Sequence, residues 1–299
     1  MEIVHTAQRE GRFSSFLREE MRMSGGLMNK LKWQERLLVN GIPQHTDYPV
    51  KPGDRLTVLL DEEPPDVPAE DGELHILYED EHLLAVDKPA GMLIHPSRAQ
   101  YTGTLANRVL GYYRKTRQKC GFHPVTRLDR DTFGIVLLAK NAYAHAFFTE
   151  MQQEKTIKKI YHAVVLGGPE QEQGVIDAPI ARLPLPSLLR QVSPEGKTCV
   201  TEYRVLERAG EFTLMELRPV TGRTHQLRVH CAHLGFPILG DPQYGGERLQ
   251  EVNRKLQIPY QQLCAKKLTF PHPLTGENMN LSSCPVPYKI DGYILLKTL

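Results

Sequence analysis

The sequence predicts an α+β fold, with a larger domain built around a mixed sheet and a small α/β module in front of it. Short apolar stretches such as residues 82–86 (HLLAV) and 134–139 (GIVLLA) have the length and composition of buried strands. Helical patterns occur between such stretches at irregular intervals rather than in a regular βαβ repeat. The 299 residues are enough for one large domain and one small one.

Composition divides the chain into an N-terminal module of residues 1–60, a linker of residues 61–73 and a larger domain of residues 74–299. The linker, DEEPPDVPAEDGE, holds seven acidic residues and no basic ones. It has no hydrophobic period with which to bury a face, so we expect an extended segment.

The N-terminal module combines a helical pattern, from Ser14 to about Lys32, with short strands bracketed by turn signals at Asn40-Gly41 and Pro52–Asp54. The VNG and PGD segments at these turns resemble the small RNA-binding module named after the fourth small-subunit ribosomal protein. An ordinary small α/β cap is the alternative. Basic side chains that could meet phosphate along the helices are Arg18, Arg22, Lys30, Lys32 and Arg36, diluted by Glu19, Glu20 and Glu35.

In the larger domain, Asn141 is placed to cap a helix over residues 142–153. The side chains of Ala144, Phe147, Phe148 and Met151 share one face of that helix, which predicts that this face contacts the core.

Residues 159–167 alternate as a strand does, with Tyr161, Ala163 and Val165 on one side. Further along, Thr224 is the expected N-cap of a second helix over residues 225–234, which Gly235 would end.

Charge is distributed unevenly along the chain. The formal net charge is +2, but residues 74–299 carry 28 basic against 21 acidic residues. A net positive domain is compatible with a phosphate-rich partner, because neutralised phosphates release condensed counterions.

Membrane and secretory signals are missing from the sequence. Apolar runs fall short of the ~18–20 residues of a membrane helix, and the N-terminus is polar. We therefore expect a cytoplasmic protein. The five cysteines are widely spaced without a CxxC pair, so we expect buried or idle thiols.

The run VTRLDRDTFGIVLLAK, residues 125–140, places charged side chains immediately before an apolar strand. Such a cluster can be a solvated loop. Two further blocks argue for a site, EKTIKKIYHAVVLGG at 154–168 and RPVTGRTHQLRVHCAHLGFPILGDPQYG at 218–245. In this order the three blocks resemble the RluA/RluD-type family of RNA pseudouridine synthases. Residues 76–97 and 263–277 resemble that family's flanking segments.

The resemblance implies a pseudouridine synthase domain with a mixed, largely antiparallel sheet flanked by helices, and an isomerase that acts on RNA. Uridine isomerisation consumes nothing and needs no cofactor, which fits a chain without the GxGxxG and GxxxxGK signatures. Asp129 is implied as the catalytic carboxylate, either as a nucleophile or as a general base. Arg228 is implied as its counter-ion, and Tyr161 as the side chain that packs against the target base.

The same resemblance and the need to extrude a base from RNA suggest substrate-binding residues. Leu263 would supply an apolar wall for the base. Arg127, Arg130 and Arg223 would hold the RNA backbone or fill the vacated space, unless they form structural ion pairs with Asp131 or Asp241.

Two positions depart from the family's pattern, since Thr126 stands where many members have histidine and Phe133 where most have serine. They put the rate and the choice of target in doubt. A metal site at His225, His230 and His233 is not expected, because helical geometry turns His225 away from His230.

Several functional alternatives stay open. The substrate expected from the resemblance is large-subunit ribosomal RNA, with transfer RNA as the alternative. A noncatalytic RNA-binding or ribosome-assembly protein could keep the fold, and a carboxylate-dependent nucleoside hydrolase would release free uracil instead. A monomer is expected.

Overall fold

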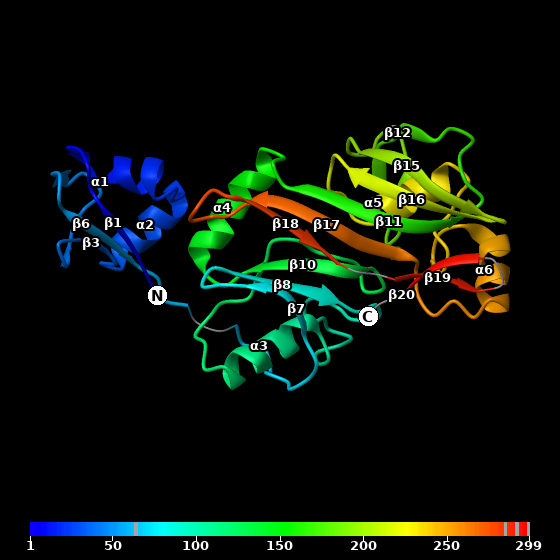
Figure 1. Ribbon diagram of the computed structural model, residues 1–299, viewed down its shortest axis with the longest axis horizontal. Helices are drawn as coiled ribbons and strands as arrows, with labels where there is room; N and C mark the ends of the chain where they lie inside the picture. Colours follow the sequence, from blue (N-terminus) through cyan, green and yellow to red (C-terminus); the bar gives the residue numbers. More distant parts are fainter. Residues whose placement is uncertain (63–64, 284–285, 291–292, 298–299) are drawn as a thin grey trace.

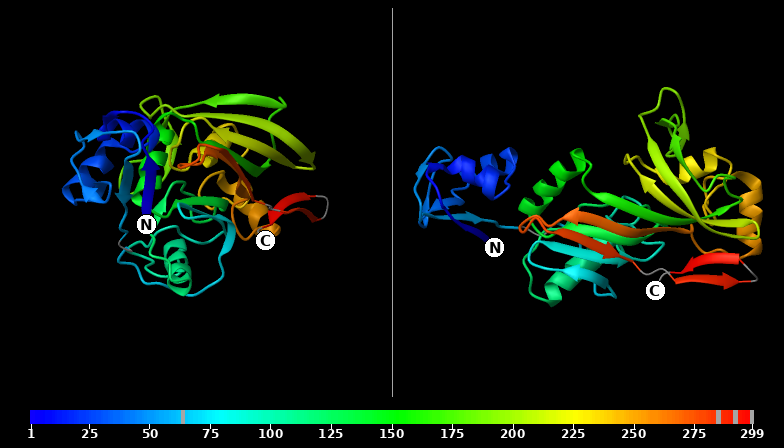
Figure 2. Two further views of the ribbon diagram at one scale, coloured as in Figure 1. Left: turned by 60° about the vertical axis from the view of Figure 1, so that its left-hand side comes forward. Right: turned by 45° about the horizontal axis from the view of Figure 1, so that its top comes forward.

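The computed structural model describes residues 1–62, 65–283, 286–290 and 293–297. Two parts are visible in Figure 1, a small unit at the N-terminal end and a long twisted sheet that carries the rest of the chain. Figure 2 shows the small unit at one end of the molecule, next to helix α4. The expected α+β class is confirmed.

The N-terminal module, residues 1–60, has a four-stranded sheet in the order β1-β6-β3-β4. Its strands are β1 (Glu2–Thr6), β3 (Leu37–Val39), β4 (Ile42–Pro43) and β6 (Arg55–Leu59), and β2 (Gly11–Arg12) pairs separately with β5 (Pro49–Val50). Its helical segments are α1 (Phe13–Ser15), η1 (Phe16–Glu20) and α2 (Gly25–Trp33). The turn between β3 and β4 uses Asn40 and Gly41 at φ 51° and 81°, as tight hairpins require.

The larger domain is built on a ten-stranded sheet in the order β12-β15-β16-β11-β17-β10-β8-β7, with β18 beside β17 and β9 beside β10. Its strands are β7 (His75–Glu79), β8 (Leu83–Lys88), β9 (His123–Pro124), β10 (Phe133–Ala139), β11 (Lys158–Leu166), β12 (Gln173–Asp177), β15 (Val200–Ala209), β16 (Phe212–Pro219), β17 (Leu263–Pro271) and β18 (Asn278–Ser282). Among the pairs of this sheet in the described residues, β10–β17 is parallel and the others are antiparallel. The expected mixed, largely antiparallel sheet is confirmed.

Two hairpins accompany the sheet. One is formed by β13 (Ile180–Arg182) and β14 (Arg190–Val192), and the other by β19 (Val286–Ile290) and β20 (Tyr293–Lys297).

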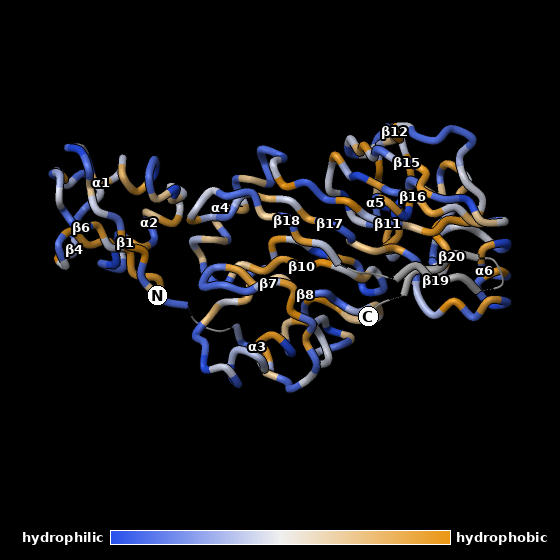
Figure 3. The backbone as a smooth tube through the Cα atoms, in the orientation of Figure 1, coloured by the Kyte–Doolittle hydropathy of each residue, from blue (hydrophilic) through white to orange (hydrophobic). Residues whose placement is uncertain are grey.

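Helices α3 (Leu105–Lys115) and α4 (Ala142–Gln153) cover opposite faces of the sheet at β8 and β10, which are largely apolar (Figure 3). Side chains alternate across a strand, so Val136 and Leu138 pack in the cluster of α3 while Ile135 and Leu137 pack in that of α4. This two-sided burial explains why residues 134–139 are continuously apolar.

Helices α5 (Gln226–His233) and α6 (Gly246–Lys255) divide the faces of β11 and β16 in the same way. The cluster of α5 includes Ala163 and Val165, while that of α6 includes Val164 and Leu166. Helices α4 and α5 therefore pack on separate stretches of the sheet, and the central strands β11 and β17 run between those stretches.

The two predicted helix starts have different outcomes. Asn141 caps α4 as predicted, its side chain accepting a hydrogen bond from the Ala144 N–H at 2.9 Å. The predicted cap at Thr224 is wrong, because α5 begins after His225, which has left-handed backbone at φ 58° and makes no capping side-chain bond.

The acidic linker lies against the larger domain rather than free of it. Val67 and Ala69 pack on the cluster around α3, and the Glu62 carboxylate accepts the Ala142 N–H at 2.5 Å. The expectation that this segment buries no face is therefore wrong for these residues, because α3 and α4 supply partners that no local period reveals.

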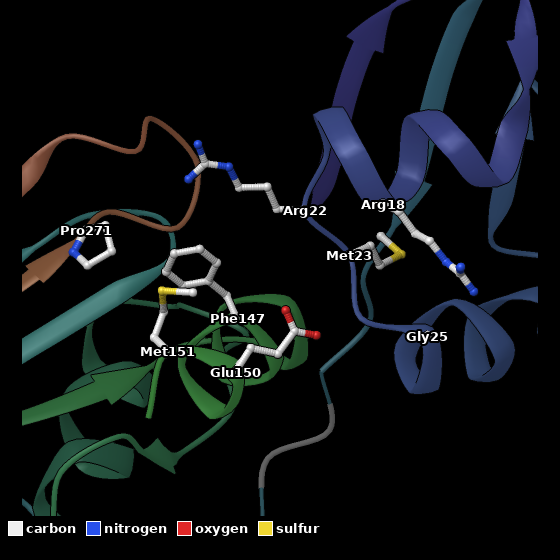
Figure 4. Close-up of a pocket in the computed structure, with 8 residues that line it drawn as sticks. All are labelled: Arg18, Arg22, Met23, Gly25, Phe147, Glu150, Met151 and Pro271. Atoms are coloured by element: carbon white, nitrogen blue, oxygen red, sulfur yellow. The ribbon is translucent and has the colours of Figure 1, made fainter. Parts of the chain in front are cut away.

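Tyr143 joins the two parts of the molecule. It belongs to α4, yet it is only 2% exposed and is a member of the hydrophobic core of the N-terminal module. Beside this contact lies a pocket of about 430 Å³, lined by Arg18 and Arg22 of the module and by Phe147 and Met151 of α4. Figure 4 shows the Arg22 side chain on the side of Phe147, whereas that of Arg18 points away from it.

Four cysteines, Cys120, Cys199, Cys231 and Cys264, are free and buried as expected, and Cys284 lies outside the described residues. Within the part of the chain that the structure describes, no helix has the length and apolar character needed to cross a bilayer.

Gly134 fixes the approach of β10 to β17. Its φ is +105°, and a Cβ there would lie 2.5 Å from the Ala265 carbonyl oxygen. We expect Gly134→Ala to destabilise the protein by about 1–3 kcal/mol or more, because it adds a backbone clash to a strained φ. The measurement is urea unfolding.

Gly41→Ala is the matched control, since Gly41 has φ +81° but no heavy atom within 4 Å of the added Cβ. It carries the conformational cost without the clash, so its loss of stability should be smaller. Equal losses would contradict the role of the β10–β17 contact.

Candidate active site

A cleft of about 1380 Å³ opens between α4 and α5, over the central strands β11 and β17. The loop before β10, the segment before α5 and strands β11 and β17 all contribute to its wall. The predicted site residues that line it are Arg127, Asp129, Tyr161, Arg223, Arg228 and Leu263. Segments that are more than a hundred residues apart in the sequence thus meet in one place.

Asp129 and Arg228 form the expected ion pair. The Arg228 Nη1 lies 3.1 Å from the Asp129 Oδ2 and donates a hydrogen bond to it. The Arg228 side chain is only 5% exposed, whereas that of Asp129 is 30% exposed and reaches the cleft. The carboxylate is therefore open to a ligand on one side and held by a buried cation on the other.

Arg228 is itself held by Asp241, from the loop before α6. Its Nε and Nη2 donate to the two carboxylate oxygens of Asp241 at 2.7 and 2.9 Å, and Nη2 also donates to the Gln243 Oε1 at 2.8 Å. This forked geometry leaves Nη1 directed at Asp129. Burial alone would lower the pKa of Arg228, but its bonds to Asp241 and the charge of Asp129 outweigh burial and raise that pKa.

Tyr161 lies on β11, where the pairing with β17 shifts register between Ile160 and Tyr161. It packs with the cluster that includes Leu263 and Leu217 and lines the cleft near Asp129. Burial raises the pKa of the Tyr161 hydroxyl, and the charge of Asp129 raises it further. The ring is therefore a neutral aromatic surface in the cleft wall.

Lys88, at the end of β8, binds the backbone of the loop that carries Asp129. The side chain is fully buried, and its Nζ donates to the carbonyl oxygens of Pro89, Met92 and Arg130 at 2.8, 2.9 and 2.9 Å. The Arg130 carbonyl follows Asp129 directly in the chain, so the lysine fixes the backbone of the loop.

The three exposed arginines have different positions. Arg127 lines the cleft, and Arg223 lines it while its Nε donates to the Thr198 carbonyl at 3.2 Å. Arg130 does not line the cleft, and its Nε lies 3.5 Å from the Asp131 carboxylate, the ion pair considered from the sequence. Asp241, the other partner considered, is instead bound to Arg228.

Thr126 and Phe133, the two departures, have structural contacts. The Thr126 hydroxyl accepts the Leu137 N–H at 2.9 Å. Phe133 is fully buried, with its ring 5.6 Å from that of Tyr260. Neither removes a charged or aromatic side chain from the cleft.

Sequence reasoning did not assign Lys88 or Asp241 to the site. Asp241 stands 13 residues after Arg228 in the block at 218–245, and this closeness in sequence was the signal that could have identified it. The bidentate contact between Asp241 and Arg228, however, depends on the path of the loop after α5, which brings Asp241 back to Arg228. Among the described residues, no group of three or more His, Cys, Asp or Glu side chains is arranged to hold a metal ion.

Comparisons with known proteins show the family of this chain. Residues 82–233, which include Asp129, Tyr161 and Arg228, match the family described as RNA pseudouridylate synthase. The chain belongs to this family. The resemblance of the larger domain to the pseudouridine synthases is thereby confirmed, and with it the class of enzyme, an isomerase acting on RNA. The resemblance of the N-terminal module stays a prediction.

Two relatives illustrate the match. The chain is 41% identical over 260 residues to an uncharacterized RNA pseudouridine synthase of Bacillus subtilis, YjbO, covering 86% of this chain and 89% of that protein. It is 40% identical over 226 residues to the ribosomal large subunit pseudouridine synthase D of Pseudomonas aeruginosa, covering 73% and 70%.

Solved structures of family members share the fold. Human RNA pseudouridylate synthase domain containing 1 superposes with a TM-score of 0.63 at 26% identity, covering 78% of this chain and 92% of that one. Human RNA pseudouridylate synthase domain containing 4 gives 0.58 at 28% identity, covering 71% and 88%.

The environment of Lys88 predicts a pH dependence of stability. Burial lowers the pKa of its ammonium from 10.5 to about 7, against the opposing charges of Asp131 and Asp129. Between these values the unfolded chain binds more protons than the folded one, so the contribution of Lys88 to stability rises with pH. We expect the unfolding free energy of wild type minus that of Lys88→Met to rise by up to about 1.4 kcal/mol per pH unit above about pH 7.

Urea unfolding from about pH 5 to 10 measures this difference, which should be flat below about pH 6. Subtracting the variant removes the titration of the other groups. A difference that does not change with pH would contradict the depressed pKa of Lys88.

Proposed function

We propose that the protein isomerises specific uridines of large-subunit ribosomal RNA to pseudouridine, with Asp129 as the catalytic carboxylate and no cofactor. The observation that carries the proposal is the Asp129 carboxylate at the cleft, bound at 3.1 Å to a buried arginine and close to the Tyr161 ring.

The reaction breaks the bond between ribose C1′ and uracil N1, turns the base and joins C1′ to C5. The proton on C5 is then lost and N1 gains one, so that the product is an isomer of the substrate. Asp129 assists as a nucleophile or as a general base in an elimination. Both routes need a carboxylate held in a defined position, and the buried Arg228 guanidinium holds the Asp129 Oδ2 at 3.1 Å. Because Asp241 binds two other nitrogens of Arg228, the guanidinium is held in place for this task.

The released uracil must stay in the cleft while it turns. Tyr161 offers an aromatic face, and stacking on a base contributes about 1–3 kcal/mol. Leu263, only 3% exposed at the start of β17, adds an apolar surface beside it. The Tyr161 hydroxyl does not need to ionise for this role.

The target base has to leave the RNA stack to reach Asp129. Arg127 and Arg223 line the cleft and are exposed, and they would bind phosphates or occupy the space that the base vacates. Arg130 would act from outside the cleft wall, next to Asp131. The basic side chains Lys155, Lys158, Lys159 and Lys267 of the same wall add to this charge.

Ribosomal RNA is favoured by the relatives. Proteins of Pseudomonas aeruginosa and Nitrosomonas europaea named ribosomal large subunit pseudouridine synthase D are 40% and 39% identical to the matched region. The N-terminal module, residues 1–60, would bind a further part of the RNA. The junction at Tyr143 would keep it at a set distance from the cleft.

Asp129→Asn should abolish pseudouridine formation, lowering the rate by at least roughly 10³-fold, while leaving the fold intact. Unmodified ribosomal and transfer RNAs are incubated with each protein, and pseudouridine is mapped by carbodiimide-blocked primer extension. Asp131→Asn, which removes a charge from the same loop outside the ion pair with Arg228, is the control and should stay active.

Each alternative has its own outcome. Primer-extension stops that occur only in transfer RNA would show that transfer RNA, not ribosomal RNA, is the substrate. Free uracil in the reaction would indicate a nucleoside hydrolase. RNA binding without product in the wild type would support a noncatalytic protein. Product from Asp129→Asn at the wild-type rate would refute the role of Asp129.

A further inference from the structure

His225 lies next to Asp129 without a role in the chemistry described so far. Its Nε2 is 3.9 Å from the Asp129 Oδ2, the oxygen that also accepts from Arg228. Its backbone is left-handed at φ 58°, which costs a residue other than glycine about 1 kcal/mol or more. The surrounding structure therefore holds this side chain at the cleft at some cost.

The other ring nitrogen of His225 is bound to Tyr244. The distance from Nδ1 to the Tyr244 hydroxyl oxygen is 2.8 Å, and that oxygen also accepts the Arg190 N–H at 3.0 Å. Tyr244 is only 9% exposed, and these two are its hydroxyl's hydrogen-bond partners among the described residues.

This arrangement selects one tautomer of His225. If Nδ1 carried the proton, the hydroxyl oxygen would accept two hydrogen bonds and its own hydrogen would have no acceptor. Leaving a buried donor unpaired costs about 1–3 kcal/mol. If the hydroxyl donates to Nδ1 instead, the hydroxyl hydrogen and Nδ1 are both paired, and the proton of the imidazole lies on Nε2, facing Asp129.

Tyr244 touches both partners of Asp129. Its ring centroid lies 4.9 Å from the Arg228 Cζ, and its N–H donates to the Asp241 Oδ1 at 3.1 Å. One tyrosine thus packs against the arginine and orients the histidine.

We propose that His225, oriented by Tyr244, is a positioning residue for Asp129: its Nε2–H donates to the Oδ2 when RNA fills the cleft and fixes the carboxylate toward the uridine. The proposal rests on the function proposed above. The distance from the His225 Nε2 to the Asp129 Oδ2 is 3.9 Å in the free protein, so it must shorten for this hydrogen bond to form. Catalytic hydrogen bonds are often long in the free enzyme and shorten in the substrate complex.

The charges around His225 are compatible with a neutral donor. Burial lowers its pKa, and Arg228 and Arg190 lower it further, while Asp129 and Asp241 act in the opposite direction. Near neutral pH the imidazole therefore carries one proton, and Tyr244 determines on which nitrogen.

The tautomer can be measured in the protein without RNA, by long-range ¹H–¹⁵N correlation of the imidazoles, with the His225 signals identified by their loss in His225→Gln. The proposal expects the Nε2–H form in the wild type and an increased Nδ1–H fraction in Tyr244→Phe. An Nδ1–H form in the wild type overturns it, whatever the activity.

Single-turnover kinetics test the role with a matched pair of variants. His225→Ala should lower the rate constant by about 10²-fold with RNA affinity unchanged, because a carboxylate displaced by about 1 Å costs that much. His225→Gln keeps an N–H near the Nε2 position and should stay within about tenfold of the wild type. An alanine variant that turns over at the wild-type rate overturns the proposal.

Tyr244→Phe keeps the ring beside Arg228 and removes the hydroxyl. This substitution should lower the single-turnover rate constant when His225 is present. It should have no further effect in the His225→Gln background, since an amide has no tautomer to select. An equal loss of rate in both backgrounds would mean that the Tyr244 hydroxyl acts only through its hydrogen bond with the Arg190 N–H. That result would refute its role through His225.

These outcomes separate the two proposals. An active wild type with an unaffected His225→Ala refutes the positioning role and leaves the function standing. A wild type that makes no pseudouridine from any tested RNA refutes the proposed function and, with it, the role of His225 in that reaction.

Discussion

The bidentate contact between Arg228 and Asp241 is the interaction on which the rest of the site depends. Asp241 is fully buried and occupies two guanidinium nitrogens, so only the Nη1 side of Arg228 is available to Asp129. A buried charge that loses its partner costs about 3–5 kcal/mol, and the three side chains therefore behave as one unit. This unit joins the first turn of α5, the loop before α6 and the loop before β10.

The loop that carries Asp129 is fixed by backbone contacts as well as by charge. The buried Lys88 ammonium holds the carbonyl after Asp129, and Gly134 lets the start of β10 approach β17 closely. The strand order of the sheet also positions the site, because β17 lies between β10, its parallel neighbour, and β11. Asp129, before β10, and Tyr161, on β11, are thereby brought into one cleft. A reaction that detaches a base and rejoins it requires rigid placement of this kind.

Much of the fold could be predicted from local pattern. The apolar run at 134–139, the Asn141 cap and the alternation through Tyr161 each report a property of a few adjacent residues, and the structure agrees with each. The cap at Thr224 failed because tertiary contacts hold His225 in a left-handed conformation and delay the helix by one residue. The linker's contact with α3 was missed because the partner surface is elsewhere in the chain.

The fold class and the family could be predicted from the sequence alone, as could a site at Asp129, Tyr161 and Arg228, because each of these residues stands in a contiguous motif. Which charges pair depends on the tertiary structure. Asp241 could have met any of several arginines, and Lys88 and His225 carry no local sign of their contacts. Hydrogen bonds and ion pairs act over about 3–4 Å in space. Residues that a sequence separates by tens of positions acquire such partners only when the sheet and its loops bring them together.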